Sequence, residues 1–312
     1  MPISEDRLNT WSQVGAGPSS RDTYATIRRA LTHEKAPFAN RSVDVFLQGS
    51  YGNDTNVWSE SDVDVVMSTD AVYHSNTDAL NQTDKATFDR QFVPATYQYD
   101  HFKSEVTTWL TGWFGKDAMP GNKAVEIAAN SSRRKADVLI STEFRLYLPS
   151  NGFMPYRYIS GVRFVTRDGQ TIVNYPKQHS ANLTTRHQES KSWLKPTIRI
   201  MKNMRNRMAD DKVIERSLAP SYFIEGMMHN VPLPAFQRSF QHAVSASLEW
   251  LWTAKFNTLS CANGIHPLVA NGTHTSWPED NYSAFLKAAV SITPKGSCAR
   301  YFRTCGLLRG TP

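Results

Sequence analysis

The sequence predicts an α+β protein with a strand-rich part followed by a helical part. Between about residues 43 and 176, short alternating apolar runs are interrupted by Gly and Pro, which is typical of strands. After about residue 185, apolar residues recur every three or four positions, which is typical of helices. Strands grouped before helices favour an α+β fold over strands and helices alternating around a parallel sheet. We therefore expect a core domain with an N-terminal helix over residues 1–188 and a helical domain over residues 189–312.

Each element follows from its local pattern. Tyr24, Ile27 and Leu31 have helical spacing, and the β-type run of residues 43–47 stops at Gly49. The elements expected in the first part are helices over 20–32 and 85–110, strands over 43–47, 63–67, 125–129 and 136–140, and short strands between 144 and 176. The helices expected in the second part cover 189–208, 220–230, 236–254 and 281–291.

The composition indicates a folded protein. The chain has 312 residues, of which 40% are hydrophobic and 11% aromatic, so it can bury a core and is not disordered. No apolar run approaches the ~18 residues that span a bilayer, and the N-terminus lacks a secretion signal, so we expect a cytoplasmic protein without membrane contact. The three cysteines, Cys261, Cys298 and Cys305, form no CxxC pair and support neither a disulfide framework nor a Cys-based zinc site.

The charge is unevenly distributed along the chain. The net charge is +7, from 35 Lys and Arg against 28 Asp and Glu. Residues 1–190 hold 20 basic and 21 acidic side chains, a balance of −1, whereas residues 191–312 hold 15 and 7, a balance of +8. Such an excess of basic residues is typical of proteins that bind a phosphate-carrying partner, either a nucleic acid or a nucleotide.

Residues 48–67 carry the most informative pattern, QGSYGNDTNVWSESDVDVVM. A strand ends at Gly49-Ser50, eleven residues intervene, and Asp62 and Asp64 then open the next strand. Side chains two apart on a strand share one face, so both carboxylates can hold divalent cations, as in enzymes that transfer nucleotidyl groups. Gly49 lets the backbone approach a phosphate, and the Ser50 hydroxyl can bind its oxygens. Either motif alone is common in turns and strand edges, but the two together predict phosphate chemistry.

This pattern resembles the nucleotidyltransferase superfamily of DNA polymerase β, whose members add a third carboxylate on a later strand. Asp137 matches best because it leads an apolar strand after the basic turn of residues 131–135. Glu126 and Glu143 remain alternatives for the third acid.

Further motifs narrow the resemblance to the bacterial relatives of cyclic GMP-AMP synthase, the CD-NTases, and within them to clade E. The matching blocks are QGSY at 48–51, SDVDVV at 61–66, NYPKQH at 174–179, RIMKNMR at 199–205 and PSY at 220–222. The resemblance implies a polymerase-β-like palm with a mixed sheet, a C-terminal lobe like that of oligoadenylate synthase, and an active site in the cleft between them. It implies that nucleoside triphosphates are joined into a cyclic oligonucleotide messenger, with a dinucleotide expected, in anti-phage defence.

The resemblance also assigns roles to individual acids. Asp62 and Asp64 would hold two Mg ions, for which Mn can substitute, and Asp137 would complete the ion that activates the attacking ribose hydroxyl. Gln48, Gly49 and Ser50 would lie at the substrate phosphates.

On the helical domain the resemblance assigns Lys202 and Ser221 to the triphosphate and Tyr222 to stacking on a base. Asn174 can read the polar edge of a pyrimidine, because an amide both donates and accepts hydrogen bonds. The alternatives are a solvated helix face for Lys202, a core aromatic for Tyr222 and a turn residue for Asn174. His179 lacks metal-ligand spacing and is expected at the surface or in a loop.

The expected partners are nucleoside triphosphates as substrates, an effector protein that binds the product, and accessory regulators. Direct sensing of duplex DNA is not expected, since no Cys or His cluster could form the zinc insertion of the metazoan relatives. Two other functions remain open. A terminal transferase could add nucleotides to RNA, a small molecule or a protein hydroxyl, with Arg133–Lys135 as a basic track. A basic nucleic-acid-binding module would need no catalysis.

Overall fold

The structure, a computed structural model, describes residues 3–15, 18–58, 62–149 and 157–293. The chain divides into two compact units. The sheet unit comprises Gly17–Tyr51 and Ser61–Lys177, and the helical unit comprises Met1–Ala16, Gly52–Glu60 and Gln178–Pro312. Within the described residues, none of the helices has both the length and the hydrophobicity needed to cross a bilayer.

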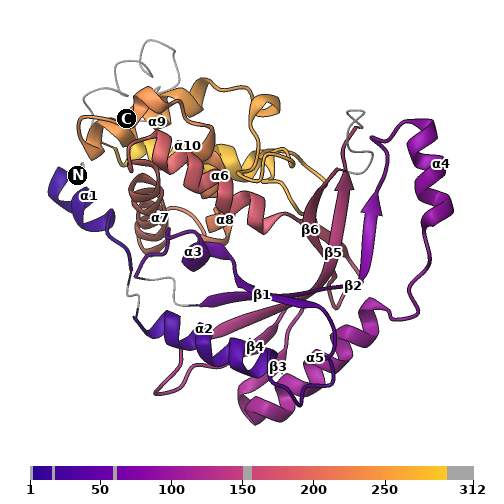
Figure 1. Ribbon diagram of the computed structural model, residues 1–312. Coiled ribbons are helices and arrows are strands. Elements are labelled where there is room, and N and C mark those ends of the chain that lie inside the picture. The colour runs from indigo at the N-terminus through magenta and orange to yellow at the C-terminus, as the bar shows by residue number, and fades with distance from the viewer. Residues whose placement is uncertain (1–2, 16–17, 59–61, 150–156, 294–312) are drawn as a thin grey trace. The chain divides into compact units, whose positions relative to one another are not determined.

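The sheet unit is built on a mixed sheet whose described strands follow the order β1-β2-β5-β4-β3, with β6 pairing with β5 and β7 (Figure 1). The strands β2 and β5 are parallel, and the other neighbours are antiparallel. The strands are β1 (Val43–Leu47), β2 (Val63–Asn76), β3 (Ala118–Pro120), β4 (Val125–Ile127), β5 (Ala136–Tyr147), β6 (Tyr158–Val165) and β7 (Thr171–Asn174). The helices are α2 (Pro18–Leu31), α3 (Gly49–Gly52), α4 (Gln82–Gln91) and α5 (Tyr99–Phe114), and Gly115–Asp117 form a 3₁₀ turn.

One face of this sheet is covered and the other carries the polar residues of interest. Val63, Val65 and Met67 of β2 are fully buried in a cluster with α2 and α5, which lie along the same side of the sheet (Figure 1). Because side chains alternate along a strand, Asp64 and Val66 point to the opposite face. The alternation in β2 thus places Asp64 on the face opposite the α2 and α5 cluster, where Val66 is itself buried in a second, smaller cluster.

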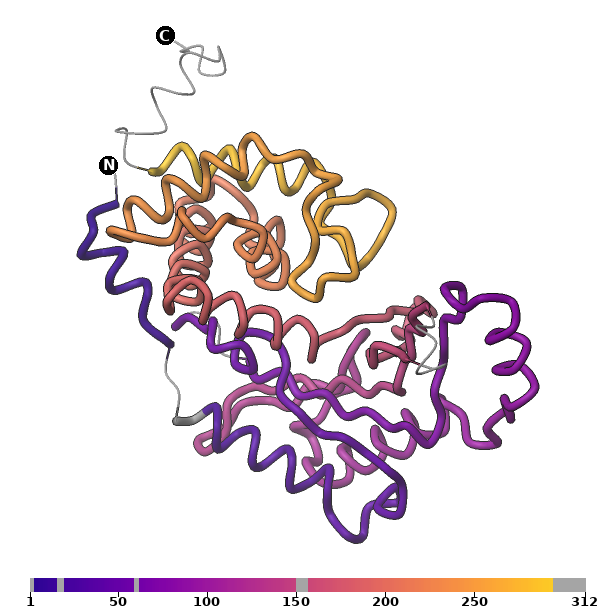
Figure 2. The backbone as a smooth tube through the Cα atoms, turned by 45° about the horizontal axis from the view of Figure 1, so that its top comes forward, coloured from indigo at the N-terminus to yellow at the C-terminus, as the bar shows by residue number. Residues whose placement is uncertain are grey.

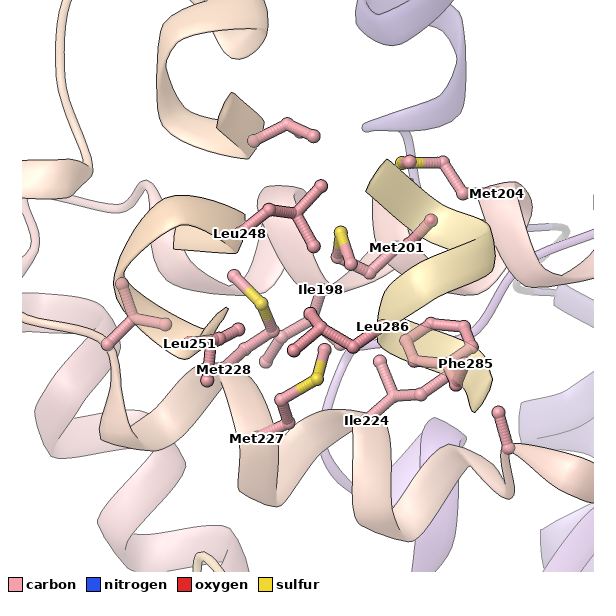
Figure 3. Close-up of a cluster of buried hydrophobic side chains, with 14 of the residues drawn as sticks. Ile198, Met201, Met204, Ile224, Met227, Met228, Leu248, Leu251, Phe285 and Leu286 are labelled. Atoms are coloured by element: carbon pink, nitrogen blue, oxygen red, sulfur yellow. The ribbon is translucent and has the colours of Figure 1, made fainter. Parts of the chain in front are cut away.

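The helical unit packs around α7 (Leu194–Asp210), which is its most extensively buried helix. Ile198, Met201 and Met204 of α7 meet apolar side chains of α8, α9 and α10 in one core, shown in Figure 3. The helices α9 and α10 pack against each other in this core (Figure 2). The remaining helices are α1 (Glu5–Trp11), α6 (Pro176–Glu189), α8 (Ser221–Asn230), α9 (Phe240–Thr253) and α10 (Glu279–Ser291), with 3₁₀ turns at Arg216–Leu218, Leu233–Ala235 and Phe256–Thr258.

Two early segments belong to the helical unit, so the observed division differs from the expected boundary at residue 188. Leu8 of α1 is buried in the helical core, and the Glu5 carboxylate accepts hydrogen bonds from the backbone N–H groups of Phe240 and Gln241 at the start of α9. These long-range contacts fix α1 on the second unit. Residues 52–58 join the same unit through contacts with α7 and α8 that are described below.

The α+β class is confirmed, and the differences from the expected elements have local causes. The helix expected over 85–110 is two helices, because Pro94 removes a backbone donor and restricts the residue before it. The helix expected over 189–208 begins only at Leu194, after Lys191 and Ser192 adopt positive φ angles of 51° and 69°. The helix α1, most of α6 and the strand β3 were not predicted from the sequence.

Candidate active site

The Gly-Ser turn lies directly against the acids of the neighbouring strand. After β1, the backbone N–H of Gln48 donates to the carbonyl of Asp64 at 3.0 Å. Gly49 has a φ of 64°, and a Cβ atom at this position would collide with the Asp64 carboxylate. Only glycine therefore fits here without strain. Ser50 follows in the short helix α3.

Strand pairing brings the three predicted acids to one face of the sheet. Asp64 of β2 and Asp137 of β5 are register partners on adjacent parallel strands, and Asp62 precedes Asp64 by two residues. Paired residues on neighbouring strands point to the same face, so the three carboxylates lie on it together.

The two alternative acids differ in position. Glu126 of β4 is the register partner of Asp137 and therefore lies beside the three acids. Glu143 lies six residues further along β5, where its carboxylate accepts hydrogen bonds from Arg145 at 2.7 Å and from Ser160 at 2.9 Å. These contacts hold Glu143 away from the Asp64–Asp137 pair.

Lys135 is a basic residue among these acids that the sequence analysis saw only as part of a basic turn. Its ammonium lies 3.3 Å from Asp62 Oδ2, 3.3 Å from Glu126 Oε2 and 3.7 Å from Asp137 Oδ1. Partial burial works against its positive charge, but Asp137 and Asp62 outweigh this and raise the pKa of Lys135. The ammonium therefore stays protonated at neutral pH.

The Asp137 carboxylate is partly buried among the other acids. Its Oδ1 atom is buried and has no hydrogen-bond partner within the described residues. Burial, opposed by Lys135 and reinforced by Asp62 and Glu126, raises the pKa of the Asp137 carboxyl. The Lys135 ammonium, 3.7 Å away, is the ion-pair partner of this oxygen, and a position among several carboxylates favours a cation.

The donor set fits magnesium, because Mg²⁺ prefers carboxylate oxygens and is usually bound by one or two of them together with substrate phosphates. As they lie, no three His, Cys, Asp or Glu side chains in the described ranges converge closely enough to hold an ion. Among the described side chains, the Lys135 ammonium is a cation that lies among these carboxylates.

Asn174, the predicted base reader, is the last residue of β7. Its side-chain oxygen accepts a hydrogen bond from the backbone N–H of Tyr175 at 2.8 Å. This contact is typical of a turn-forming asparagine, and a role in reading a base remains a prediction.

In the helical unit, Lys202 is completely buried rather than on a solvated face. Its ammonium lies 2.8 Å from Glu225 Oε1 and 3.1 Å from Thr55 Oγ1. The other Glu225 oxygen accepts from Asn53 Nδ2 at 3.0 Å and lies 2.7 Å from His179 Nε2. The expectation of a surface His179 is therefore wrong, because its imidazole is only 2% exposed.

The other bases of α7 also have partners inside this unit. Lys195 pairs with Asp54, and the Arg199 guanidinium donates to the backbone carbonyls of Ser12 and Asp54. Arg205 donates to the carbonyl of Ala219. These bases, which contribute to the charge excess of the second half, thus stabilise the helical unit.

Ser221 and Tyr222 open α8. The Ser221 hydroxyl accepts a hydrogen bond from Arg205 at 3.2 Å. The Tyr222 ring stacks on His179, with 4.7 Å between the ring centroids, and its hydroxyl accepts from Asn263 Nδ2 at 3.0 Å. The Tyr222 ring therefore makes core contacts, and whether Ser221 and Tyr222 contact a nucleotide remains a prediction.

Known proteins with similar sequences and structures identify the family. Residues 181–293 match the cGAS/DncV-like nucleotidyltransferase C-terminal helical domain. The chain is 34% identical to a cyclic UMP-AMP synthase of Rhodothermus marinus over 92% of its own length and 96% of that protein. It is 32% identical to the cyclic nucleotide synthase CdnE01 of Staphylococcus haemolyticus over 92% and 97% of the two chains. The chain belongs to the CD-NTase family.

A solved structure extends this result to the fold. The Rhodothermus marinus CdnE c-UMP-AMP synthase, solved with Apcpp and Upnpp, has a TM-score of 0.82 and 31% sequence identity, covering 100% of this chain and 99% of that one. The predicted CD-NTase resemblance, the α+β fold with a C-terminal helical domain and the nucleotidyltransferase activity are therefore confirmed. The position of Lys135 and the hydrogen bonds of Glu225 were not predicted from the sequence, because both depend on contacts between distant segments.

Proposed function

We propose that this CD-NTase joins nucleoside triphosphates into a cyclic dinucleotide in the cytoplasm, using Asp62, Asp64 and Asp137 with divalent metal ions. The observation that carries the proposal is the register pair of Asp64 and Asp137, with Gly49 packed against Asp64. A relative named as a cyclic UMP-AMP synthase, 34% identical over most of the chain, supports this product class.

The reaction follows from the groups on the sheet. A ribose hydroxyl oxygen attacks the α-phosphorus of a second triphosphate, a new P–O bond forms, and the bond to the β-phosphate breaks so that pyrophosphate leaves. The hydroxyl proton passes to the Asp137 carboxylate or to water that it orients. When bound, Mg²⁺ or Mn²⁺ would act as a Lewis acid at the α-phosphate. A second transfer of the same kind within the linear intermediate closes the ring.

The remaining contacts belong to the proposal too. Gln48, Gly49 and Ser50 would hold phosphate oxygens through the turn. Tyr222 would support a base, and Asn174 could select a pyrimidine in line with the uridine of the cited relative. For Lys202 and Ser221 to reach the triphosphate, Lys202 would have to exchange its bond to Glu225 for a phosphate oxygen.

The direct test is to incubate the purified chain with ATP, UTP, GTP and CTP, singly and in pairs, with Mg²⁺ or Mn²⁺, and to identify products by mass spectrometry. We expect a cyclic dinucleotide that is absent from the Asp62→Asn/Asp64→Asn variant and present with Asp70→Asn, an exposed acid on the same strand. Only linear oligonucleotides would instead support a terminal transferase.

Within the described residues, the contacts of the expected RNA track do not favour that second function. Arg133 pairs with Asp117 at 2.8 Å, Arg134 donates to the Tyr51 hydroxyl at 3.1 Å, and Lys135 lies among the acids. The three bases of the expected RNA track are thus bound to other residues of the sheet unit.

The biological role is proposed from the family resemblance. The product would activate an effector protein in anti-phage defence, and accessory proteins would regulate the synthase. Plating phage on cells that carry the chain with its neighbouring genes, or the Asp62→Asn/Asp64→Asn variant in the same context, tests this role. Equal plaque numbers on both would contradict it.

A further inference from the structure

Lys135 is held among the acids by geometry as well as by charge. It precedes Asp137 by two residues, and its backbone carbonyl accepts a hydrogen bond from Val63 at 2.9 Å, between Asp62 and Asp64. Its ammonium contacts carboxylates that come from three separate segments, at Asp62, Glu126 and Asp137. The backbone pairing therefore aims a four-carbon side chain at the place where these acids meet.

A single ammonium and a divalent ion cannot both use these oxygens at low cost. Like charges within a few ångströms repel strongly near a protein surface, so an arriving metal ion must displace the ammonium. The Lys135 side chain is 39% exposed and flexible, which allows it to move away. A triphosphate supplies both further oxygen ligands for the metal and new acceptors for the displaced ammonium.

We propose that Lys135 is an internal counter-ion that competes with the divalent metal for Asp62 and Asp137 and makes tight metal binding depend on a bound triphosphate. The inference rests on the proposed function, because it takes these acids as metal ligands. Without nucleotide, Lys135 partly neutralises the acids and keeps the affinity for metal low. With nucleotide, the ammonium moves to the phosphates and the metal takes its place.

The test measures Mn²⁺ binding to the full chain without nucleotide, from the electron paramagnetic resonance signal of free Mn²⁺. We expect Lys135→Met to bind Mn²⁺ about tenfold more tightly than the unmodified protein and Lys135→Arg to bind it equally. Lys116→Met serves as the matched control, because it removes the same charge from an exposed position of the sheet unit. Circular dichroism at each step verifies that the variants are folded.

A second measurement links the effect to the acids and to the nucleotide. The gain in Lys135→Met should disappear when Asp64→Asn is added. A non-hydrolysable triphosphate should tighten Mn²⁺ binding more in the unmodified protein than in Lys135→Met, because only the former has a competing ammonium to displace.

Three results would overturn the role of Lys135. These are an unchanged Mn²⁺ affinity in Lys135→Met, an equal gain in Lys116→Met, or no Mn²⁺ binding by any variant at millimolar concentration. Its failure can be told apart from failure of the proposed function. A cyclic product from the unmodified chain, with unchanged Mn²⁺ affinity in Lys135→Met, would contradict only the role of Lys135. A changed Mn²⁺ affinity without any nucleotide product would contradict the proposed synthesis of a cyclic dinucleotide.

Discussion

Each unit of the molecule contains a cluster of oppositely charged side chains. The two clusters differ in which charge is surrounded and in how exposed it is. In the sheet unit one cation, Lys135, lies among carboxylates, and its side chain is 39% exposed. In the helical unit one carboxylate, Glu225, lies among donors that include Lys202 and His179, and both ends of the Lys202–Glu225 pair are almost completely buried, at 0% and 2%. An exposed cluster can exchange partners, whereas a buried cluster loses stability when one partner is removed. The comparison therefore contrasts a charge cluster whose partners can exchange with a buried charge cluster that stabilises the helical unit.

The largest expected effect is on catalysis, from the exposed cluster. Asp64→Asn should lower product formation on the order of 10³-fold, because it would remove a charged ligand of the proposed metal ions. The free energy of unfolding should not fall, since the change also relieves repulsion among the acids. Mass spectrometry of the product and urea denaturation measure the two quantities, with Asp70→Asn as the control. A marked loss of stability in Asp64→Asn would show that this cluster, too, supports the fold.

The next effect is on stability, from the buried cluster. Glu225→Ala should lower the free energy of unfolding by about 3–5 kcal/mol, because Lys202 would remain charged and buried without its partner. The double variant Glu225→Gln/Lys202→Met should lose less, since it removes both charges and keeps one side-chain oxygen that can accept from Thr55 or Asn53. Urea denaturation compares the variants. If the double variant loses more than Glu225→Ala, the buried charge is not the cause.

The acids of the sheet unit could be predicted from the sequence more fully than the buried cluster around Glu225. Gly49, Asp62 and Asp64 were predictable, because a turn and the strand after it are encoded locally. Asp137 was predicted as the third acid because it leads an apolar strand, but its pairing with Asp64 depends on a parallel register that single-sequence patterns do not encode. Glu225 could not have been found, because its partner Thr55 lies 170 residues away in the sequence.

The fold shows the same limit. Strand β1 has the predicted bounds, and the two-part order of strands and helices is correct, because both follow from local periodicity. The assignment of α1 to the helical unit depends on Glu5 binding the start of α9, more than 230 residues away. Neither charge balance nor periodicity contains that information.

A pH effect of intermediate size should come from His229 in the helical unit. Burial lowers the pKa of His229 to about 4, so the folded state binds a proton more weakly than the unfolded state, whose imidazole has a pKa near 6.5. The contribution of His229 to stability is present above pH 6.5 and is lost as the pH falls towards 4. Urea denaturation at pH 7, 6 and 5 should therefore show a shallower decline for His229→Gln. The contribution of His229 is the difference between the declines of His229→Gln and of the unmodified protein. The decline of one protein alone is not enough, because burial also lowers the pKa of His74, His187 and His266. If the free energy of unfolding declines equally with falling pH in His229→Gln and in the unmodified protein, His229 is not a source of the pH effect.

The smallest effect on the free energy of unfolding should come from an ion pair in which both side chains are exposed. Arg207 and Asp211 lie one helical turn apart, with 2.5 Å between Nε and Oδ2, and both side chains are about half exposed. Asp211→Asn should change the free energy of unfolding by only about 0–0.5 kcal/mol. Urea denaturation beside Glu225→Ala provides the comparison. If Asp211→Asn loses as much unfolding free energy as Glu225→Ala, burial does not explain the large effect of Glu225→Ala.

The measurement that tests the central claim most directly compares Asp137→Asn with Glu126→Gln, since these register partners lie side by side on the sheet and both lie near Lys135. Both variants would be incubated with the nucleoside triphosphates that the unmodified chain uses, with Mg²⁺ or Mn²⁺, and the cyclic product quantified by mass spectrometry. We predict that Asp137→Asn makes no detectable product and that Glu126→Gln retains most of the activity. Product from Asp137→Asn, with none from Glu126→Gln, would contradict the assignment of Asp62, Asp64 and Asp137 as the catalytic centre.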